Sequence, residues 1–372
     1  MFISKKATEQ LRKNIQESRE AFCSGLFLSS RWFVLSQIVH KDLHFVILPT
    51  RESAEYCTAD LYNLLEGDCV FYLPESGKGV ERSNYKSSLG VQRTAAVGKL
   101  IQHFSEEPLV IVSYPEALEE RIPEPRQLQE ALFTIHTGDR MPYDQLIQKL
   151  TGENFERVDF VSIPGQFAVR GSVIDIFSYS MDKPYRLTYF GNEVEKIHLF
   201  DCNTQLSTAT ADVADIYPDI VSRGSEEGEG VSITSLIPDE MLVWLDSSDM
   251  YKEKSFFGEL SGKKKVYLDI PLSREGVNAV KFNIAPQPVF NKNFELLISD
   301  IREKMEDHYQ VFIYGEKESQ LERLRSIMLQ DEHAVMPGFI KGKNIHAGFI
   351  DKDDKYAATR IMKSLTASTG FG

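Results

Sequence analysis

The sequence predicts an α/β protein with a parallel-sheet domain, an inserted α+β domain and a small C-terminal α/β domain. Short apolar runs alternate with helical patterns in the first third of the chain, as in βα units. A segment rich in strands and in Gly and Pro turns follows, and helix and strand patterns alternate again near the end. Because 372 residues exceed one ordinary core, several compact units are expected.

The first domain is expected over residues 1–118. Its runs HFVILP, CVFYLP and LVIVSY are short and apolar, which is typical of strands buried on both faces of a parallel sheet. Proline fixes φ and lacks a backbone donor, so the RIPEPR stretch at 121–126 predicts a hinge. A domain boundary near residue 118 follows.

The inserted domain is expected over residues 119–212. The pattern YDQLIQKLTG predicts a helix, whereas RVDFVSI, QFAVRGSVIDIFS, YRLTYF and EVEKIHLF predict strands. Residues 213–285 are expected to return to the first domain, with MLVWLD as a strand and the acidic GSEEGEG stretch as a loop or linker.

The small third domain is expected over residues 286–372. Helices are predicted at FELLISDIREKME and SQLERLRSIML, a strand at YQVFIYG and a short ordered segment at AGFID. The closing LTASTGFG has little to bury and is expected to fray. The preceding KYAATRIMKS predicts no definite fold.

Composition points to a folded protein of the cytoplasm. With 42% hydrophobic and 26% charged residues, no apolar run approaches the roughly 20 residues that span a bilayer, and the start lacks an export signal. The four cysteines are scattered without a CxxC pair, so reduced thiols are expected, with no metal site. A monomer without membrane contact is expected.

The formal net charge of -13 disfavours an autonomous surface for duplex DNA. One stretch, residues 76–99, is nevertheless basic. It carries one acidic residue, Glu81, against Lys78, Arg82, Lys86, Arg93 and Lys99. A solvated surface is the favoured interpretation of this stretch, and a phosphate track for DNA is the alternative.

The motif GxxxxGK[ST] cradles nucleotide phosphates, and its best-placed counterpart here begins at Gly25. The positions expected to read GK[ST] are Ser29, Ser30 and Arg31, and bulky residues fill the loop. The rival string at 76–79, SGKG, lacks a hydroxyl after its lysine and is expected to be an ordinary turn. We therefore expect no working nucleotide site in these residues.

A motor ATPase also needs two acidic residues after an apolar strand. The run MLVWL leads into Asp246 and Asp249, but Ser247 stands where the second carboxylate is expected. A loop or helix cap is the favoured interpretation. With no HExxH or GxSxG pattern either, no catalytic residue and no cofactor are expected.

The run YRLTYF suggests a binding surface. Period-two alternation places Arg186, Thr188 and Phe190 on one face of the strand. Arg170, followed by Gly171, lies close by if the neighbouring strands pair. An exposed arginine beside a phenylalanine is typical of interface centres, while the alternative is a buried Phe190 with solvated arginines.

The run from Val158 to Gly171, continued by SVIDIFS, PYRLTYFGNEVEKIHLFD and TQLST, resembles the signature region of bacterial transcription-repair coupling factors (Mfd) and their relative UvrB. The resemblance implies a degenerate helicase-like, UvrB-like first domain (1a) that residues 213–285 complete (1b). It also implies that residues 119–212 are domain 2, which binds UvrA. The contact residues carried over are Arg170, Gly171, Arg186, Thr188 and Phe190.

By the same resemblance, this chain is expected to be the repair-recruitment module of a longer protein. It would bring UvrA and nucleotide excision repair to stalled RNA polymerase. ATP, Mg, RNA polymerase and DNA would be bound by the translocase part that follows. The alternatives are a UvrB-like ATP-dependent protein that processes DNA damage, and a direct DNA binder through residues 76–99.

Three positions depart from the family pattern. Gln166 stands where the family usually has glutamate, Asn192 where it often has aspartate, and Thr188 where it has an acidic residue. Each change removes negative charge near Arg170 and Arg186. We expect the charge complementarity with a partner to be altered.

Overall fold

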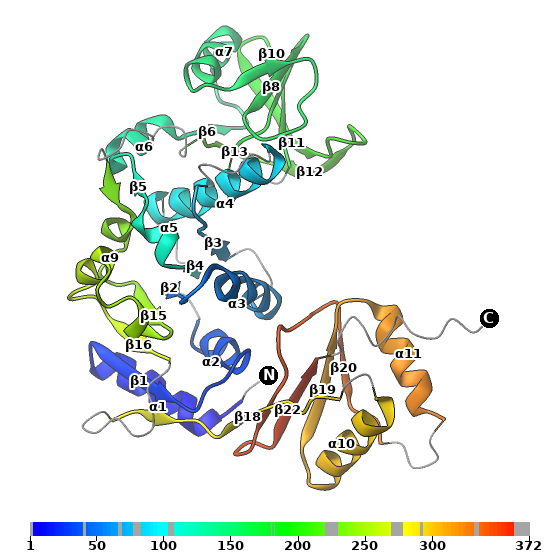
Figure 1. Ribbon diagram of the computed structural model, residues 1–372. Helices are drawn as coiled ribbons and strands as arrows, with labels where there is room; N and C mark the ends of the chain where they lie inside the picture. The colour runs from blue at the N-terminus through cyan, green and yellow to red at the C-terminus, as the bar shows by residue number, and fades with distance from the viewer. Residues whose placement is uncertain are drawn as a thin grey trace.

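In the computed structural model, an inserted domain lies at one end of the molecule and a C-terminal unit at the other (Figure 1). The structure describes residues 3–39, 42–65, 69–76, 83–102, 108–179, 181, 183–219, 230–268, 278–290, 293–330 and 335–360, with side chains from residue 89 to 101 in the fourth range. No helix among these residues is long and apolar enough to cross a membrane.

The central element is a seven-stranded sheet in the order β17-β1-β16-β15-β2-β4-β3, in which every pair is parallel. Its strands are β1 (Glu20–Ser24), β2 (Leu43–Ile47), β3 (Val70–Tyr72), β4 (Leu109–Ser113), β15 (Leu242–Leu245), β16 (Lys265–Tyr267) and β17 (Val280–Lys281). Four strands precede the inserted domain in sequence and three follow it, so the sheet closes only when both parts of the chain meet.

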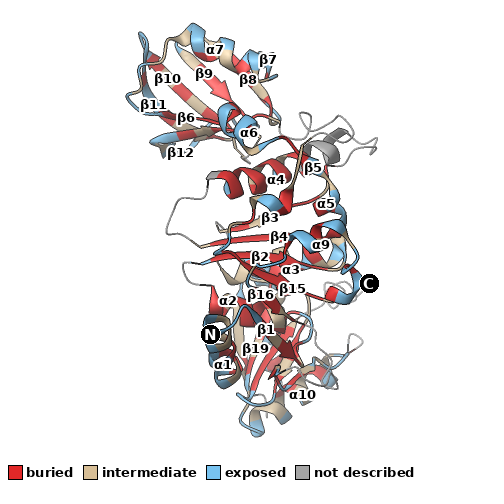
Figure 2. Ribbon diagram, turned by 90° about the vertical axis from the view of Figure 1, so that its left-hand side faces the viewer, coloured by how far each residue is buried: buried red, intermediate tan, exposed pale blue. Residues whose placement is uncertain are grey.

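Helices cover both faces of this sheet (Figure 2). They are α1 (Lys5–Glu17), α2 (Ser30–Ile38), α3 (Arg51–Leu64), α4 (Ser83–Gln102), α5 (Pro115–Glu119) and α9 (Ser255–Glu259), with the 3-10 turns η1 (Ile233–Leu236) and η2 (Ser248–Met250). Strands β2 and β4 are buried along their whole length. Alternate residues, such as Val46 and Ile47, enter separate cores on the two faces, as expected for a doubly covered parallel sheet.

The inserted domain centres on a six-stranded sheet in the order β12-β11-β10-β9-β8-β7. Its elements are α6 (Pro125–Ala131), β6 (Phe133–His136), α7 (Tyr143–Gly152), β7 (Glu156–Val158), β8 (Gln166–Arg170), β9 (Val173–Ile176), β10 (Tyr185–Phe190), β11 (Glu193–Phe200), β12 (Ser207–Ala211) and β13 (Val213–Ile216). One face packs on α7 through Leu146 and Leu150, and β6 pairs with β13 beside it. The short pair β5 (Arg121–Ile122) and β14 (Val231–Ser232) connects this domain to the first.

The C-terminal unit is a five-stranded mixed sheet in the order β18-β21-β22-β19-β20 with two helices. Its elements are β18 (Ile284–Pro286), α10 (Phe294–Glu306), β19 (Gln310–Gly315), α11 (Glu318–Met328), β20 (Gly338–Lys341), β21 (Phe349–Asp351) and β22 (Tyr356–Arg360). The unit shares a core with the first domain. The ring of Phe33 on α2 makes edge contacts with Tyr314 and Phe349, at centroid distances of 5.8 and 4.9 Å.

The predicted fold class is confirmed, since a parallel sheet, an inserted domain and a C-terminal α/β unit are all present. The predicted helices over 143–152, 294–306 and in 318–328 are found as α7, α10 and α11. The domain boundaries at 118, 212 and 285 stay predictions. The pairing of β13 with β6 extends past residue 212, and β18 begins at residue 284.

Two local predictions were wrong or incomplete. RVDFVSI was predicted as a strand, but only its first residues continue β7 (Glu156–Val158), and the rest forms a loop because Val161 turns inward to a small core. KYAATR, left without a predicted fold, contains β22, which lies inside the C-terminal sheet. The predicted loop at 224–229 and the frayed end after residue 360 lie outside the described residues.

The shared core makes a first testable prediction. Phe33→Ala removes a ring that is 2% exposed and contacts three aromatic rings of the C-terminal unit, so it should lower the free energy of unfolding by about 3–5 kcal/mol in urea denaturation. The matched control is Tyr62→Ala, whose ring is 57% exposed. A loss below about 1 kcal/mol for Phe33→Ala, equal to that of the control, would contradict a shared core.

Candidate functional site

The sheet of the inserted domain has one open face, and β10 shows which face it is. Tyr185, Leu187 and Tyr189 are buried against α7, whereas Arg186 and Thr188 are half-buried and Phe190 is exposed. The Phe190 side chain is 80% exposed, the largest value among the large hydrophobic residues described. The predicted alternation is therefore correct, and the alternative of a buried Phe190 is excluded.

A buried carboxylate holds the two arginines of this face together. Asp175 on β9 is paired in register with Arg186 on β10 and with Ala168 on β8. Its side chain is 1% exposed. Arg186 donates to it twice, from Nε to Oδ1 at 2.7 Å and from Nη2 to Oδ2 at 2.9 Å. Arg170 donates from Nη2 to the same Oδ2. The cluster thus carries two positive charges and one negative charge.

Arg186 is fixed by further contacts. Its Nη1 donates to the carbonyl of Gln205 at 3.1 Å, and its guanidinium carbon lies 4.0 Å from the ring centroid of Phe200. The hydrogen bond to Asp175 raises the pKa of Arg186 above its ordinary value, because the carboxylate stabilises the charged form. Arg186 is therefore held in its charged form by Asp175.

Two tight turns lie at the same end of the sheet. Gly171, with φ of 59°, lies between β8 and β9, and Gly191, with φ of 63°, lies between β10 and β11. Positive φ is easily adopted by glycine, which lets each hairpin reverse within two residues. The turns place Arg170 and Phe190 at strand ends beside solvent. Gly171 acts through its backbone, and its carbonyl accepts from Tyr143 Oη at 2.9 Å.

Other segments of the chain occupy the space around the loop that begins at Gly25. A Cβ at Gly25 would lie 2.1 Å from the carbonyl oxygen of Phe282. Counted from Gly25, the GxxxxGK[ST] spacing places Arg31 at the lysine position, one residue later than predicted. Arg31 Nη1 donates to Asp246 Oδ2 at 2.6 Å, and that carboxylate is 3% exposed. Ser30 is also occupied, since its hydroxyl bonds Phe27.

The C-terminal unit contacts the same loop. Ser29 Oγ accepts from the backbone N–H of Ala347 at 2.9 Å, and Asp60 Oδ1 accepts from that of His346 at 2.6 Å. Burial raises the pKa of Asp60 to about 6, although hydrogen bonds from Ser29 and His346 oppose the shift. Residues 346 and 347 thus lie against the region that phosphates would occupy in a nucleotide-binding protein.

Comparison with known protein families identifies the inserted domain. Residues 133–220, from β6 to just past β13, match the family model of the UvrB interaction domain. The chain carries a UvrB interaction domain. All five residues predicted to contact a partner lie in this domain, on or beside its open face: Arg170, Gly171, Arg186, Thr188 and Phe190.

Similarity extends beyond the UvrB interaction domain. The chain is 28% identical over 218 residues, 57% of its length, to the transcription-repair-coupling factor of Bacillus subtilis. It is 26% identical over half its length to that of Mycobacterium tuberculosis, and 24% identical over 72% to the UvrABC system protein B of Methanococcus maripaludis. The matches span 18%, 15% and 42% of these relatives, so the chain corresponds to less than half of each.

Sequence reasoning missed three residues of the open face. Asp175 belongs to no recognised motif, although a lone aspartate inside the apolar run VIDIF is unusual for a strand. Phe160 was placed in a strand and instead projects from a loop, 60% exposed. Gln166 was noted only as a lost charge, whereas its amide organises that loop.

Two basic residues of the 76–99 stretch have described side chains, Arg93 and Lys99, and they do not share a surface. Arg93, expected on a solvated or phosphate-binding face, is 2% exposed, because it donates to the carbonyls of Pro74 and Ala117 and pairs with Glu120. Lys99 is exposed over the ring of Phe71. Lys78, Glu81 and Arg82 lie outside the described residues, as does the side chain of Lys86.

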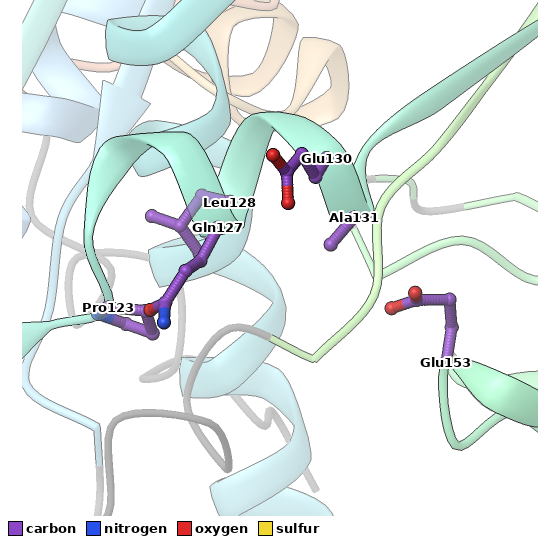
Figure 3. A pocket seen from close by; sticks show the side chains of 6 residues that line it. All are labelled: Pro123, Gln127, Leu128, Glu130, Ala131 and Glu153. Atoms are coloured by element: carbon purple, nitrogen blue, oxygen red, sulfur yellow. The ribbon is translucent and has the colours of Figure 1, made fainter.

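A pocket of about 450 Å³ lies where α6 meets the end of α7 (Figure 3). Two carboxylates, of Glu130 and Glu153, contribute to its wall, together with Pro123 of the predicted hinge. Two carboxylates in the wall make this pocket a poor site for an anionic ligand. We assign the pocket to the joint between the domains.

The contact between Asp60 and the C-terminal unit makes a prediction about pH. Because the pKa of Asp60 rises from 3.8 to about 6 on folding, its protonated form stabilises the fold, and that contribution is lost as pH rises through 6. Asp60→Asn keeps the acceptor for His346 but does not titrate. Between pH 4.5 and 7.5, the native protein should therefore lose about 2 kcal/mol more stability than this variant in urea unfolding.

The matched control is Asp212→Asn, at an exposed carboxylate, which should follow the native pH profile. If Asp60→Asn also followed the native profile, Asp60 would titrate as an ordinary surface group.

Proposed function

We propose that this chain binds UvrA through the open face of its UvrB interaction domain, and that it recruits nucleotide excision repair to stalled RNA polymerase in the cytoplasm. The observation that carries the proposal is the 80% exposed Phe190 beside an arginine cluster, inside the segment that matches the UvrB interaction domain. The similarity to transcription-repair-coupling factors supports the second half of the proposal.

The chemistry of the face suits a protein partner. Aromatic and arginine residues dominate the energetics of protein interfaces, and this face exposes Phe190 and part of Arg170. Arg170 and Arg186 outweigh the single charge of Asp175, so this three-residue cluster is positive on a chain of net charge -13. Such a cluster favours a partner that presents an acidic side chain at the contact.

We further propose that these residues do not hydrolyse ATP, and that ATP and Mg are used by a motor elsewhere in the full protein. This proposal is supported by the contacts that other parts of the chain make with the Gly25 loop. Arg31 bonds the carboxylate of Asp246 that a magnesium ion would need, and Phe282 O lies against Gly25. Asp249, the other acidic candidate, forms an exposed ion pair with Lys252.

Binding to UvrA can be tested by calorimetric titration of the purified chain with the cognate UvrA. Phe190→Ala should weaken the affinity at least about tenfold, because an exposed ring at the centre of an interface loses its whole buried area. The variant should keep the native melting temperature. Val289→Ala, which truncates a 71% exposed residue of the C-terminal unit, serves as the control and should bind like the native chain.

Nucleotide binding can be tested on the same protein. With Mg present, titration of ATP should give no saturable heat below about 1 mM, and the rate of phosphate release should equal that of buffer. Micromolar affinity or turnover that disappears in Asp246→Asn would instead support the UvrB-like alternative.

A further inference from the structure

The loop at 159–165 presents a second exposed aromatic ring beside the arginine cluster. Phe160 is 60% exposed, and the guanidinium carbon of Arg170 lies 4.9 Å from its ring centroid. The next residue, Val161, is 2% exposed and packs with Ala168 and Phe200 in a small core on this face. The chain is therefore anchored immediately after Phe160, so the ring projects from an ordered loop.

Gln166 fixes the other side of the loop. Its Oε1 accepts from the backbone N–H groups of Ser162 and Ile163, at 3.0 and 3.3 Å, and from the Ser162 hydroxyl. Its Nε2 donates to Glu156 Oε2 at 3.2 Å. A glutamate could accept the same bonds but could not donate to Glu156, and the two carboxylates would repel each other. The amide at this position thus suits a loop that holds Phe160 in place.

The two arginines have different surroundings. Arg186 keeps only 19% of its side chain exposed, and its donors go to Asp175 and Gln205. Arg170 keeps 36% exposed, and it donates to Asp175 from Nη2 alone among its three nitrogens. Among the described residues, none accepts a hydrogen bond from its remaining donors, which are therefore available to a partner. Arg186 therefore holds the cluster in place, whereas Arg170 is placed to contact a partner.

Building on the proposed binding of UvrA through Arg170 and Phe190, we propose that Phe160 is a further contact residue, stacked on Arg170 at the centre of the contact. Asp175, Arg186 and Gln166 are positioning residues behind them. The matching surface on UvrA is an acidic side chain beside an apolar depression. The carboxylate pairs with Arg170, and the depression takes the ring of Phe160.

Charge and order both support this arrangement. The cluster of two guanidinium groups and one carboxylate leaves one positive charge, and Arg170 is its more exposed member. An arginine stacked on an aromatic ring loses less freedom when it binds, because the ring already restricts it. Hydrogen-bonded loops that hold aromatic anchors ready likewise reduce the ordering cost of association.

The experiment is a titration of the cognate UvrA with the native chain and three variants, at two salt concentrations, with a melting temperature for each. Phe160→Ala should weaken binding at least fivefold at unchanged melting temperature. Arg170→Gln should weaken it similarly and reduce the slope of log Kd against log salt, because a direct ion pair is lost. Arg186→Gln should lower the melting temperature and keep the native salt slope.

A reciprocal pair tests the positioning role of Gln166. Gln166→Glu should weaken binding, because the loop loses its bond to Glu156 and gains a repulsion. In the double variant with Glu156→Gln, the amide at position 156 donates to the carboxylate at position 166. The bond between the two side chains is restored in the opposite direction, so the double variant should recover native affinity. A purely local effect on stability would not produce this recovery of affinity at constant melting temperature.

The outcomes separate this inference from the proposed function. If the native chain does not bind UvrA, both the proposed function and this inference are wrong. If the native chain binds and Phe190→Ala weakens it, but Phe160→Ala and Arg170→Gln bind within twofold of native, the inference alone is overturned. A melting temperature lowered as much by Arg170→Gln as by Arg186→Gln would also overturn it, since Arg170 would then be a support.

Discussion

The pairing of β15 with β2, and of β16 with β1, is the constraint on which the rest of the molecule depends. These parallel pairs join strands that lie on opposite sides of the inserted domain in sequence. Neither part of the chain can bury its apolar strands alone, so the sheet forms only when both are present. The two ends of the UvrB interaction domain are thereby held together, and the ion pair between Arg31 and Asp246 links the same two parts.

Within the UvrB interaction domain, one buried carboxylate has a comparable role. Asp175 at 1% exposure would be unfavourable alone, because removing a carboxylate from water costs several kcal/mol. The guanidinium groups of Arg170 and Arg186 offset that cost, and their hydrogen bonds to Asp175 hold both arginines in place. A face with a fixed arginine cluster and two exposed aromatic rings results, held by these ion pairs together with the small core of Val161, Ala168 and Phe200.

The sequence was sufficient for those features that follow from repeating patterns. The parallel sheet was visible in apolar runs such as LVIVSY, and the open face was visible in the alternation of Arg186, Thr188 and Phe190. Family resemblance to the UvrB interaction domain gave the location of the candidate surface. The roles of the residues predicted for partner contact still rest on that resemblance and on the geometry around them.

Features that depend on long-range contacts were not predictable. Arg93 belongs to a basic stretch by sequence, but it is buried because three segments meet around it. The loop of Phe160 looked like a strand, because hydrophobic alternation cannot show that Val161 joins Phe200 in a separate core. Strand β22 follows no local signal and is recruited by the neighbouring strands on both sides.

The packing of the C-terminal unit on the Gly25 loop limits what a single substitution in that loop could change. Replacing Arg31 by lysine would leave the Ala347 amide on Ser29 and the Phe282 carbonyl against Gly25. Both contacts come from segments far along the chain, so a lysine at this position would meet a loop that its neighbours still cover. The sequence of this loop therefore cannot be interpreted apart from the unit that packs on it.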